Sequence, residues 1–319
     1  MYKLLSDFFY DKNYDLRISK NFRWIDQKCT YDVLSIVSDC ILEYINNKMD
    51  TFKVKDIWFN EYTVINVSNL FTKPNPSNKS SREYDKYFGQ PINLLVYAGV
   101  LKQNKVNNVR HFKVTNKEIL EYIALRPMNA LNFLCEYIKK VLKDTDIYHY
   151  FVNFLNNTNS YTFKYLKENV TSFYKENTKI KGTLEIYRIF TKIINPLSFV
   201  NKSLGTKKGY LSKNIITLDD LTYNKANFRD LKPKNMSRND YVQVINKKIN
   251  ETTYRKYLID KAKKAIKMLN QKYNNKSEII GLTDNNDATQ VHHIFPQSKF
   301  PQIADYLENL IALTPINIS

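Results

Sequence analysis

Apolar residues recur at intervals of three and four along several stretches of the chain. Within residues 31–44, for example, Leu34, Val37 and Ile41 follow this interval with polar residues between them. That period is typical of an amphipathic helix. The same pattern predicts three further helices, which run from Ile119 to Leu125, from Leu131 to Val141 and from Leu184 to Ile194. Pro196 should end the last of these helices.

The longest helical pattern covers Thr252 to Tyr273. One stripe of this pattern is apolar and is expected to face a core, and it holds Leu258, Ala262, Ala265 and Leu269. Lysines lie away from the stripe and form either a solvated face or a surface along DNA, and they are Lys261, Lys263, Lys264 and Lys267.

Residues 51–124 contain a predicted helix that is followed by two short strands. The helix is Pro91 to Ala98, because proline favours the first turn of a helix and a glycine such as Gly99 favours the position just past its end. Residues 100–102 and 110–114 are the predicted strands, around an Asn-rich turn from Gln103 to Asn108. Before the helix, a polar stretch from Lys73 to Ser81 is expected to be a loop.

A helix followed by a basic hairpin is the outline of a winged-helix module, although any small α+β segment can share it. In such a module a helix enters the DNA major groove while the hairpin contacts phosphates. The sequence therefore predicts four DNA contacts in the hairpin, which are Lys102, Lys105, Arg110 and Lys113.

Residues 201–241 are polar and basic and show no sustained period, which predicts an extended loop. Such loops can follow a phosphate backbone with lysines while aromatic side chains pack or stack. Lys207 and Lys208 are the candidate DNA contacts here, and the interleaved aromatic residues are Tyr210, Tyr223 and Phe228. The alternative is a solvated linker.

The charge of the chain favours a polyanionic partner. Its 319 residues hold 49 Lys and Arg against 31 Asp and Glu, a formal charge of +18, and such an excess is typical of proteins that bind nucleic acid or anionic membranes. No stretch approaches the roughly 18 apolar residues of a transmembrane helix. The N-terminus is a poor secretory signal, so we expect a cytoplasmic protein without a membrane partner. The 3 cysteines lack C-x-x-C spacing, which predicts buried, reduced thiols.

These patterns predict an α+β protein with a mostly helical body. We expect an N-terminal helical segment, a winged-helix module, a second helical region, a basic loop with a Lys-rich helix, and a C-terminal unit, over residues 1–50, 51–124, 125–200, 201–275 and 276–319.

Two of the 4 histidines are adjacent, His292 and His293, and they follow the strand-like run Thr289 to Val291. Neighbouring residues on a strand point to opposite faces, so one of the two would be misplaced in a core. At the end of a strand, one imidazole can instead face a metal ion and the other a substrate phosphate. Asn309 follows later in the chain and leads into a second predicted strand, Ile311 to Thr314.

This arrangement resembles the HNH, or ββα-metal, nucleases. That family has a histidine pair at the end of one strand, a loop, an asparagine before a second strand, and a helix that donates further metal ligands. The resemblance covers residues 288–315. It implies an incomplete ββα-metal unit at the C-terminus, a divalent cation such as Mg²⁺ or Mn²⁺ as cofactor, and double-stranded DNA as substrate.

The resemblance also assigns roles to single residues. His292 would be a metal ligand and His293 the general base, since an imidazole with a pKa of about 6.5 can accept a proton near neutral pH. A backbone carbonyl should hold the other ring nitrogen of His293 and fix its tautomer. Asn309 would tie the loop together and keep His293 oriented, or would simply cap the second strand.

The sequence departs from the family at its end. The family helix should place a histidine at position 318, where this chain has Ile318. Loss of one A from codons for Asn-Gln-His-Phe-Ser gives Ile-Asn-Ile-Ser, which are residues 316–319. We therefore expect the product of a frameshifted nuclease gene. The alternatives are a shortened form of a longer protein and a natural variant completed by another polypeptide.

The sequence thus predicts an HNH-class DNA endonuclease, most similar to a type II restriction enzyme, that acts as a homodimer on palindromic sites. If the HNH unit is truncated, the chain should bind DNA but cleave it weakly. Three alternatives stay open at this point. They are a phage or homing nuclease, a non-catalytic DNA-binding protein with a relic HNH unit, and a protein that binds RNA or a membrane surface.

Overall fold

A computed structural model describes most of the chain. The described residues are 2–47, 51–71, 73, 76, 81–223, 235–237, 240, 251–273, 275–279 and 286–314. They form helices and small antiparallel sheets, which confirms the α+β prediction. Most of the predicted loop 73–81, as well as Phe228 and residues 315–319, lie outside the described residues.

The chain divides into two compact units. Unit 1 comprises Met1–Val67 and Pro74–Asp230, and unit 2 comprises Ser68–Lys73 and Leu231–Ser319. The division into five segments stays a prediction. The helices before residue 230 are α1 (Tyr2–Tyr10), α2 (Leu16–Ser19), α3 (Tyr31–Asn47), α4 (Val54–Trp58), α5 (Glu61–Phe71), α6 (Ser81–Tyr97), α7 (Lys117–Leu125), α8 (Pro127–Asp144), α9 (Tyr148–Asn156), α10 (Ser160–Asn177), α11 (Thr183–Val200) and α12 (Leu218–Leu221).

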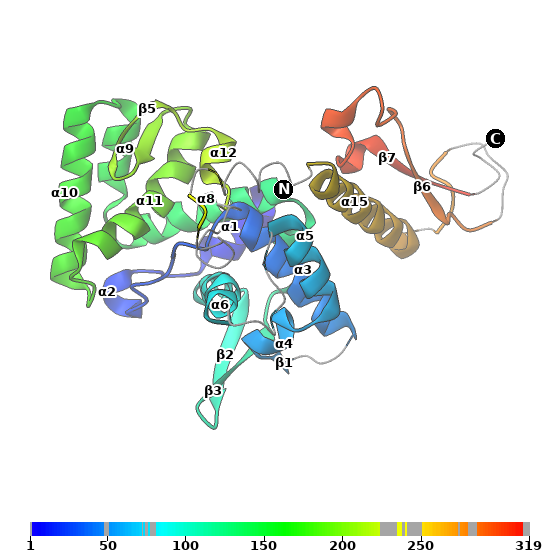
Figure 1. Cartoon of the computed structure of the whole chain (residues 1–319), viewed down its shortest axis with the longest axis horizontal. Coiled ribbons are helices and arrows are strands. Elements are labelled where there is room, and N and C mark those ends of the chain that lie inside the picture. The colour runs from blue at the N-terminus through cyan, green and yellow to red at the C-terminus, as the bar shows by residue number, and fades with distance from the viewer. Residues whose placement is uncertain are drawn as a thin grey trace. The chain divides into compact units, whose positions relative to one another are not determined.

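The core of unit 1 forms where helices pack around α3 and α8. Helix α3 contacts α6, α7 and α8, and α8 also contacts α11 (Figure 1). Aromatic side chains fill much of this core, because Phe9, Phe133 and Tyr137 lie within ring-contact distance of one another. Trp24 packs on Tyr137 and donates its indole N–H to the Tyr174 hydroxyl at 3.0 Å. The buried polar ends of Trp24 and Tyr174 are therefore hydrogen-bonded to each other.

A three-stranded antiparallel sheet forms one part of unit 1. It contains β1 (Thr51–Phe52), β3 (Val109–Val114) and β2 (Leu101–Val106) in that spatial order, and the β2–β3 hairpin projects from the helices (Figure 1). Its turn is only Asn107 and Asn108, both with positive φ, a geometry that asparagine tolerates well. The predicted turn from Gln103 to Asn108 was therefore too long, since its first four residues extend strand β2.

Two proline-based predictions were wrong. Helix α6 begins ten residues before Pro91, and α11 continues past Pro196 to Val200. Proline in a helix interior is unfavourable by roughly 3 kcal/mol, but both prolines are buried. Packing in the core therefore outweighs the local helix-breaking effect. The predicted end of α6 is correct, because Gly99 follows it with φ +80°.

Residues 204–221 are ordered structure rather than the predicted loop. Strands β4 (Leu204–Lys207) and β5 (Tyr210–Ile215) form an antiparallel hairpin, and α12 follows it. The two turn residues, Lys208 and Gly209, both have positive φ. The sequence shows no alternating period here because the hairpin contains a bulge and lies on α11 along only part of its length.

Unit 2 contains a helix that packs against a short hairpin. Helix α15 (Glu251–Tyr273) contacts β6 (Gln290–His293), β7 (Leu310–Leu313) and the 3₁₀ turn η2 (Leu307–Asn309), and a second 3₁₀ turn, η1 (Pro301–Ile303), lies in the loop between the strands. The helix has the predicted bounds to within one residue. Its buried stripe is displaced by about one position, and it holds Ile259, Ala262, Ile266 and Asn270. Of the predicted stripe only Ala262 is fully buried, and Leu269 is 43% exposed.

The described part of the chain contains no helix that is long and apolar enough to cross a membrane. The three cysteines, Cys29, Cys40 and Cys135, are free thiols and buried, as predicted. Burial raises the pKa of the Cys29 and Cys135 thiols to about 12. These thiols are therefore protonated at neutral pH, as expected for packing residues.

Candidate functional site

The histidine pair lies at the end of strand β6, as predicted. Strands β6 and β7 pair in antiparallel register, with His292 opposite Ile311 and His293 opposite Leu310. Leu310 is buried in the cluster that joins the hairpin to α15. Because side chains alternate along a strand, His293 shares the α15 side of the hairpin and His292 lies on the other side. The two imidazoles therefore lie on opposite faces of the hairpin.

The ring of His293 is held by a backbone carbonyl. Its Nε2 atom lies 3.0 Å from the carbonyl oxygen of Ala304, in the loop that connects the two strands. A carbonyl oxygen can only accept a hydrogen bond, so Nε2 carries the proton. In the neutral imidazole Nδ1 is then unprotonated and can accept a proton. This is the tautomer that a general base with a held ring requires.

The side chain of Asn309 fastens the loop between the strands. Its Oδ1 accepts a hydrogen bond from the Phe295 amide at 2.7 Å, and its Nδ2 donates to the carbonyl oxygens of Phe295 at 3.2 Å and Ile303 at 3.3 Å. Asn309 is only 3% exposed. It thus joins both ends of the loop that supplies Ala304 to His293. The geometry allows both functions considered for this residue, since β7 begins at the next position.

His292 has no set of metal ligands around it in the part of the chain that the structure describes. Its Nε2 lies 3.2 Å from Oε1 of Gln290, two residues earlier on the same face. No group of three or more His, Cys, Asp or Glu side chains among the described residues could hold a metal ion. A stable divalent site needs more protein ligands than this. The described residues alone therefore do not fit a complete cation site.

A glutamate that the sequence did not single out supports strand β7. The Ala312 amide donates to the Glu278 carboxylate at 2.8 Å, and the Glu278 amide donates to the Ala312 carbonyl at 3.0 Å. Glu278 therefore satisfies backbone groups of β7 that face away from β6. This contact depends on tertiary structure, so no local motif could have revealed it.

The four candidate DNA contacts of the β2–β3 hairpin are all exposed. Lys102 lies directly opposite Lys113, and Lys105 lies directly opposite Arg110. No carboxylate among the described residues pairs with any of these four cations, although Arg110 donates to Asn93 of α6 at 3.1 Å. The alternation of the strands puts the two cationic pairs on opposite faces of the hairpin. Both faces of the projecting hairpin are thus positively charged.

Helix α6, which precedes this hairpin, is mostly enclosed. Tyr84, Tyr87 and Phe88 are fully buried, and the exposed side chains of the helix include Asp85 and Lys86. A helix that reads bases needs an open face over several turns. The hairpin is therefore a better candidate for DNA contact than the helix.

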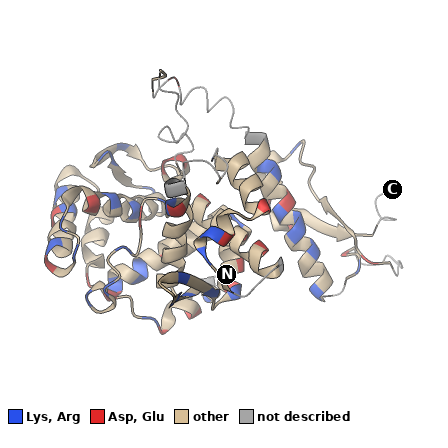
Figure 2. Ribbon diagram, turned by 60° about the horizontal axis from the view of Figure 1, so that its bottom comes forward, with Lys and Arg blue, Asp and Glu red and all other residues tan. Residues whose placement is uncertain are grey.

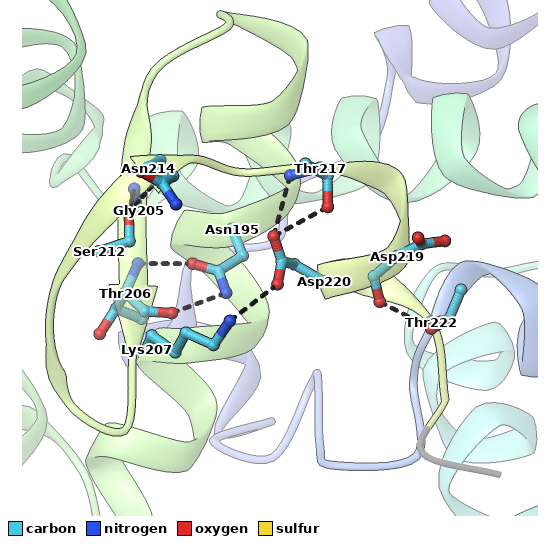
Figure 3. Close-up of polar contacts among 10 residues, drawn as sticks. All are labelled: Asn195, Gly205, Thr206, Lys207, Ser212, Asn214, Thr217, Asp219, Asp220 and Thr222. Carbon is cyan, nitrogen blue, oxygen red and sulfur yellow. Dashed lines mark hydrogen bonds and ion pairs between the residues drawn. The ribbon is translucent and has the colours of Figure 1, made fainter. Parts of the chain in front are cut away.

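The second pair of candidate contacts lies on the β4–β5 hairpin. Lys207 is 3.5 Å from a carboxylate oxygen of Asp220 (Figure 3). Lys208 occupies the exposed turn. Hydrogen bonds from the backbone N–H and hydroxyl of Thr217 hold the pKa of Asp220 below its usual value, so this carboxylate is ionised and partly neutralises Lys207. Lys208 is thus the more available cation of the pair.

The β4–β5 hairpin is fixed to α11 by a side chain that the sequence did not reveal. Asn195 accepts from the Thr206 amide at 2.8 Å and donates to the Thr206 carbonyl at 3.0 Å, so its carboxamide replaces a neighbouring strand (Figure 3). Gly205 lies beside this contact. A β-carbon at position 205 would be 2.6 Å from Oδ1 of Asn195 and 2.6 Å from Cγ1 of Ile216. The close approach therefore requires glycine.

Basic residues also recur along α15, the helix that supports the histidine hairpin (Figure 2). Lys256, Lys264 and Lys267 are exposed, with Asp260 between them. At 3.6 residues per turn, Lys256 and Lys267 lie about a quarter turn from the centre of the buried stripe, and Lys264 lies nearly opposite it. The two functions predicted for this helix, core packing and a lysine face, therefore occupy different sides of it.

Comparisons of the chain with protein-family models, with curated proteins and with solved structures found no match. The resemblance to HNH nucleases therefore stays a prediction that rests on residues 288–315. The contacts of His293 and Asn309 are the structural observations that bear on it.

Replacing Asn309 should loosen the loop after the histidine pair. Asn309→Ala leaves the Phe295 amide without its acceptor, and the loss of such a buried partner is unfavourable by about 1–3 kcal/mol. We expect amide hydrogen exchange at Phe295 to become faster by the factor that corresponds to this free energy. Asn309→Asp keeps the acceptor but loses both donated bonds and should give an intermediate rate. Exchange at the wild-type rate in the alanine variant would show that the loop is held by other contacts.

Two glycine substitutions should have opposite effects on stability. Gly205→Ala places a methyl group against Asn195 and Ile216, and such overpacking is unfavourable by about 1–3 kcal/mol. Gly89→Ala, inside α6, meets nothing within 4 Å and should stabilise the helix by about 0.5–1 kcal/mol. Urea unfolding followed by circular dichroism measures both. An unchanged midpoint for Gly205→Ala would contradict the close packing described.

Proposed function

We propose that this chain is a DNA endonuclease of the HNH class, similar to a type II restriction enzyme, that hydrolyses phosphodiester bonds of double-stranded DNA with a divalent cation. One observation carries the proposal. The carbonyl of Ala304 holds the imidazole of His293 at Nε2. Ala304 lies in the loop between the strands, which Asn309 fastens at both ends. This supports the roles that the resemblance assigns to His293 and Asn309.

In the proposed reaction, the chain's own residues position and activate water. Nδ1 of His293 accepts the proton of the attacking water, because Nε2 already donates to Ala304. The water oxygen bonds to phosphorus while the bond to the 3′ oxygen breaks, and the leaving 3′ oxygen takes a proton from solvent. Asn309 keeps the ring in this orientation by holding the loop. A cation such as Mg²⁺ or Mn²⁺ would stabilise negative charge on the phosphate. His292 is one candidate ligand, and the other ligands would have to come from outside the described residues.

Recognition of duplex DNA is proposed for unit 1. The order α3, β1, α4, α5, α6, β2, β3 and the sheet order β1-β3-β2 support a winged-helix module whose hairpin contacts phosphates. Contacts are proposed from Lys102, Lys105, Arg110 and Lys113, with further contacts from Lys207 and Lys208. Cleavage of both strands of a palindrome would require two copies of the site, and hence a homodimer.

A second candidate function is DNA binding without catalysis. The absence of a set of metal ligands among the described residues favours it. In that case the β6–β7 hairpin serves only to cover α15, and the histidine pair has no catalytic function. Cleavage assays distinguish the two proposals, because both predict the same DNA affinity.

Replacing His293 tests the proposed chemistry. Loss of a general base typically lowers a rate by 10²–10⁴, so His293→Ala should reduce cation-dependent nicking of supercoiled plasmid by at least about 100-fold. DNA affinity should not change. His149→Ala, at an exposed position of α9, is the matched control and should cleave like wild type. If the wild-type chain binds duplex DNA but never nicks it with Mg²⁺ or Mn²⁺, the non-catalytic proposal is correct.

Replacing the hairpin cations tests the proposed interface. Each phosphate contact contributes about 0.9 to the slope of log affinity against log salt. The double variant Lys105→Ala/Arg110→Ala should therefore lower the slope for duplex DNA by about 2. Lys179→Ala/Lys181→Ala removes the same charge from another exposed surface and serves as the control. Equal changes in both variants would mean that only the net charge of the chain matters.

A further inference from the structure

The turn of the β4–β5 hairpin and the first half of α10 line an open groove. Its volume is about 410 Å³, within the range of small-molecule pockets. The lining includes Ser160, Phe163, Lys164, Lys167, Tyr210 and Leu211. The groove lies entirely within unit 1 and contains none of the residues of the histidine hairpin.

An exposed aromatic ring forms one wall of this groove. Tyr210 is 77% exposed, and no other described ring contacts it. By contrast, Tyr223 is 6% exposed and packs on Tyr87. Burying one face of the Tyr210 ring against a flat partner would be favourable. Of the aromatic residues interleaved with lysine in this region, Tyr210 is thus available for stacking and Tyr223 is not.

Two lysines of α10, Lys164 and Lys167, line the opposite wall. Lys167 donates to the Gly209 carbonyl at 2.7 Å and lies 4.0 Å from the centre of the Tyr187 ring. No carboxylate among the described residues pairs with it, and partial burial lowers the pKa of its amine. Lys164 is 3.9 Å from Glu168, but the side chains of both are more than 60% exposed, so this ion pair is weak. Lys167 thus fastens the wall, and Lys164 is the cation available to an anion in the groove.

The walls are held in place before any ligand binds. Lys167 fastens the turn to α10 through Gly209, and Asn195 fastens the strand before the turn to α11 (Figure 3). The Gly205 amide also donates to Ser212 across the hairpin at 2.9 Å (Figure 3). A groove fixed in this way loses little conformational entropy on binding.

We propose that this groove binds one nucleotide of an unpaired nucleic-acid strand, with the base stacked on Tyr210 and the phosphate beside Lys164. Proteins that bind single strands combine a basic groove with exposed aromatic rings, because an unpaired base has a free face for stacking. Bases inside a duplex are already stacked on each other. The inference goes beyond the proposed hydrolysis of duplex DNA and holds even if the histidine hairpin is inert.

Tyr210 variants test the stacking. The probe is a fluorescein-labelled DNA single strand of about 15 nucleotides, and the same strand annealed to its complement, measured by fluorescence anisotropy. Tyr210→Ala should weaken binding of the single strand by about tenfold and leave duplex binding within about twofold, since it removes the ring on which one unpaired base stacks. Tyr210→Phe keeps the ring and should bind like wild type. Tyr10→Ala, which removes another exposed tyrosine, is the matched control.

Lys164 variants test the phosphate contact. Lys164→Ala should lower the salt slope for the single strand by about 0.7, whereas Lys175→Ala, on the same helix outside the groove, should not change it. The inference is overturned if Tyr210→Ala binds the single strand like wild type, if it weakens both probes equally, or if Tyr210→Phe loses as much affinity as Tyr210→Ala. The endonuclease proposal fails on a different result, namely if the wild-type chain does not bind duplex DNA or does not nick it.

Discussion

The candidate chemistry of this chain lies on short hairpins, and a two-stranded hairpin alone is barely stable in water. The β2–β3 hairpin is supported by strand β1, and the other two are fastened by polar side chains that bond to backbone. Asn195 does so for the β4–β5 hairpin and Glu278 for strand β7, while Asn309 closes the loop beside His293. An amide or carboxylate side chain can replace the backbone partner that a missing strand would offer. The positions of Lys207, Lys208 and the histidine pair depend on these contacts.

The helices were largely predictable from the sequence, because apolar spacing reports directly on burial. Helices α3, α7, α8 and α15 were found where the period of three and four predicted them. Prolines were misleading, since local rules describe an isolated helix and Pro91 and Pro196 lie in a packed core. The stripe of α15 was displaced because its apolar arc is wide and the hairpin covers only one side of it, at Ala262 and Ile266.

The candidate site was predictable to a different extent. The spacing of His292, His293 and Asn309 predicted a hairpin, and the resemblance to HNH nucleases implied a held imidazole and a fastened loop. The sequence could not reveal that Asn195 and Glu278 support hairpins, since each acts across a contact that no local pattern encodes. Nor could it show that Asp220 neutralises one of two adjacent lysines, or that Tyr210 is exposed while Tyr223 is buried.

Because cations lie opposite each other on the β2–β3 hairpin, salt affects the stability of the hairpin and its binding to a polyanion in opposite directions. Like charges directly opposite each other destabilise a strand pair, so Lys102 and Lys113, and likewise Lys105 and Arg110, repel one another in the unbound chain. Added salt screens this repulsion and strengthens the free hairpin. The same salt weakens the attraction to a polyanion. Binding of a polyanion and folding of the hairpin tip are thus thermodynamically linked, and the ligand stiffens the element that holds it.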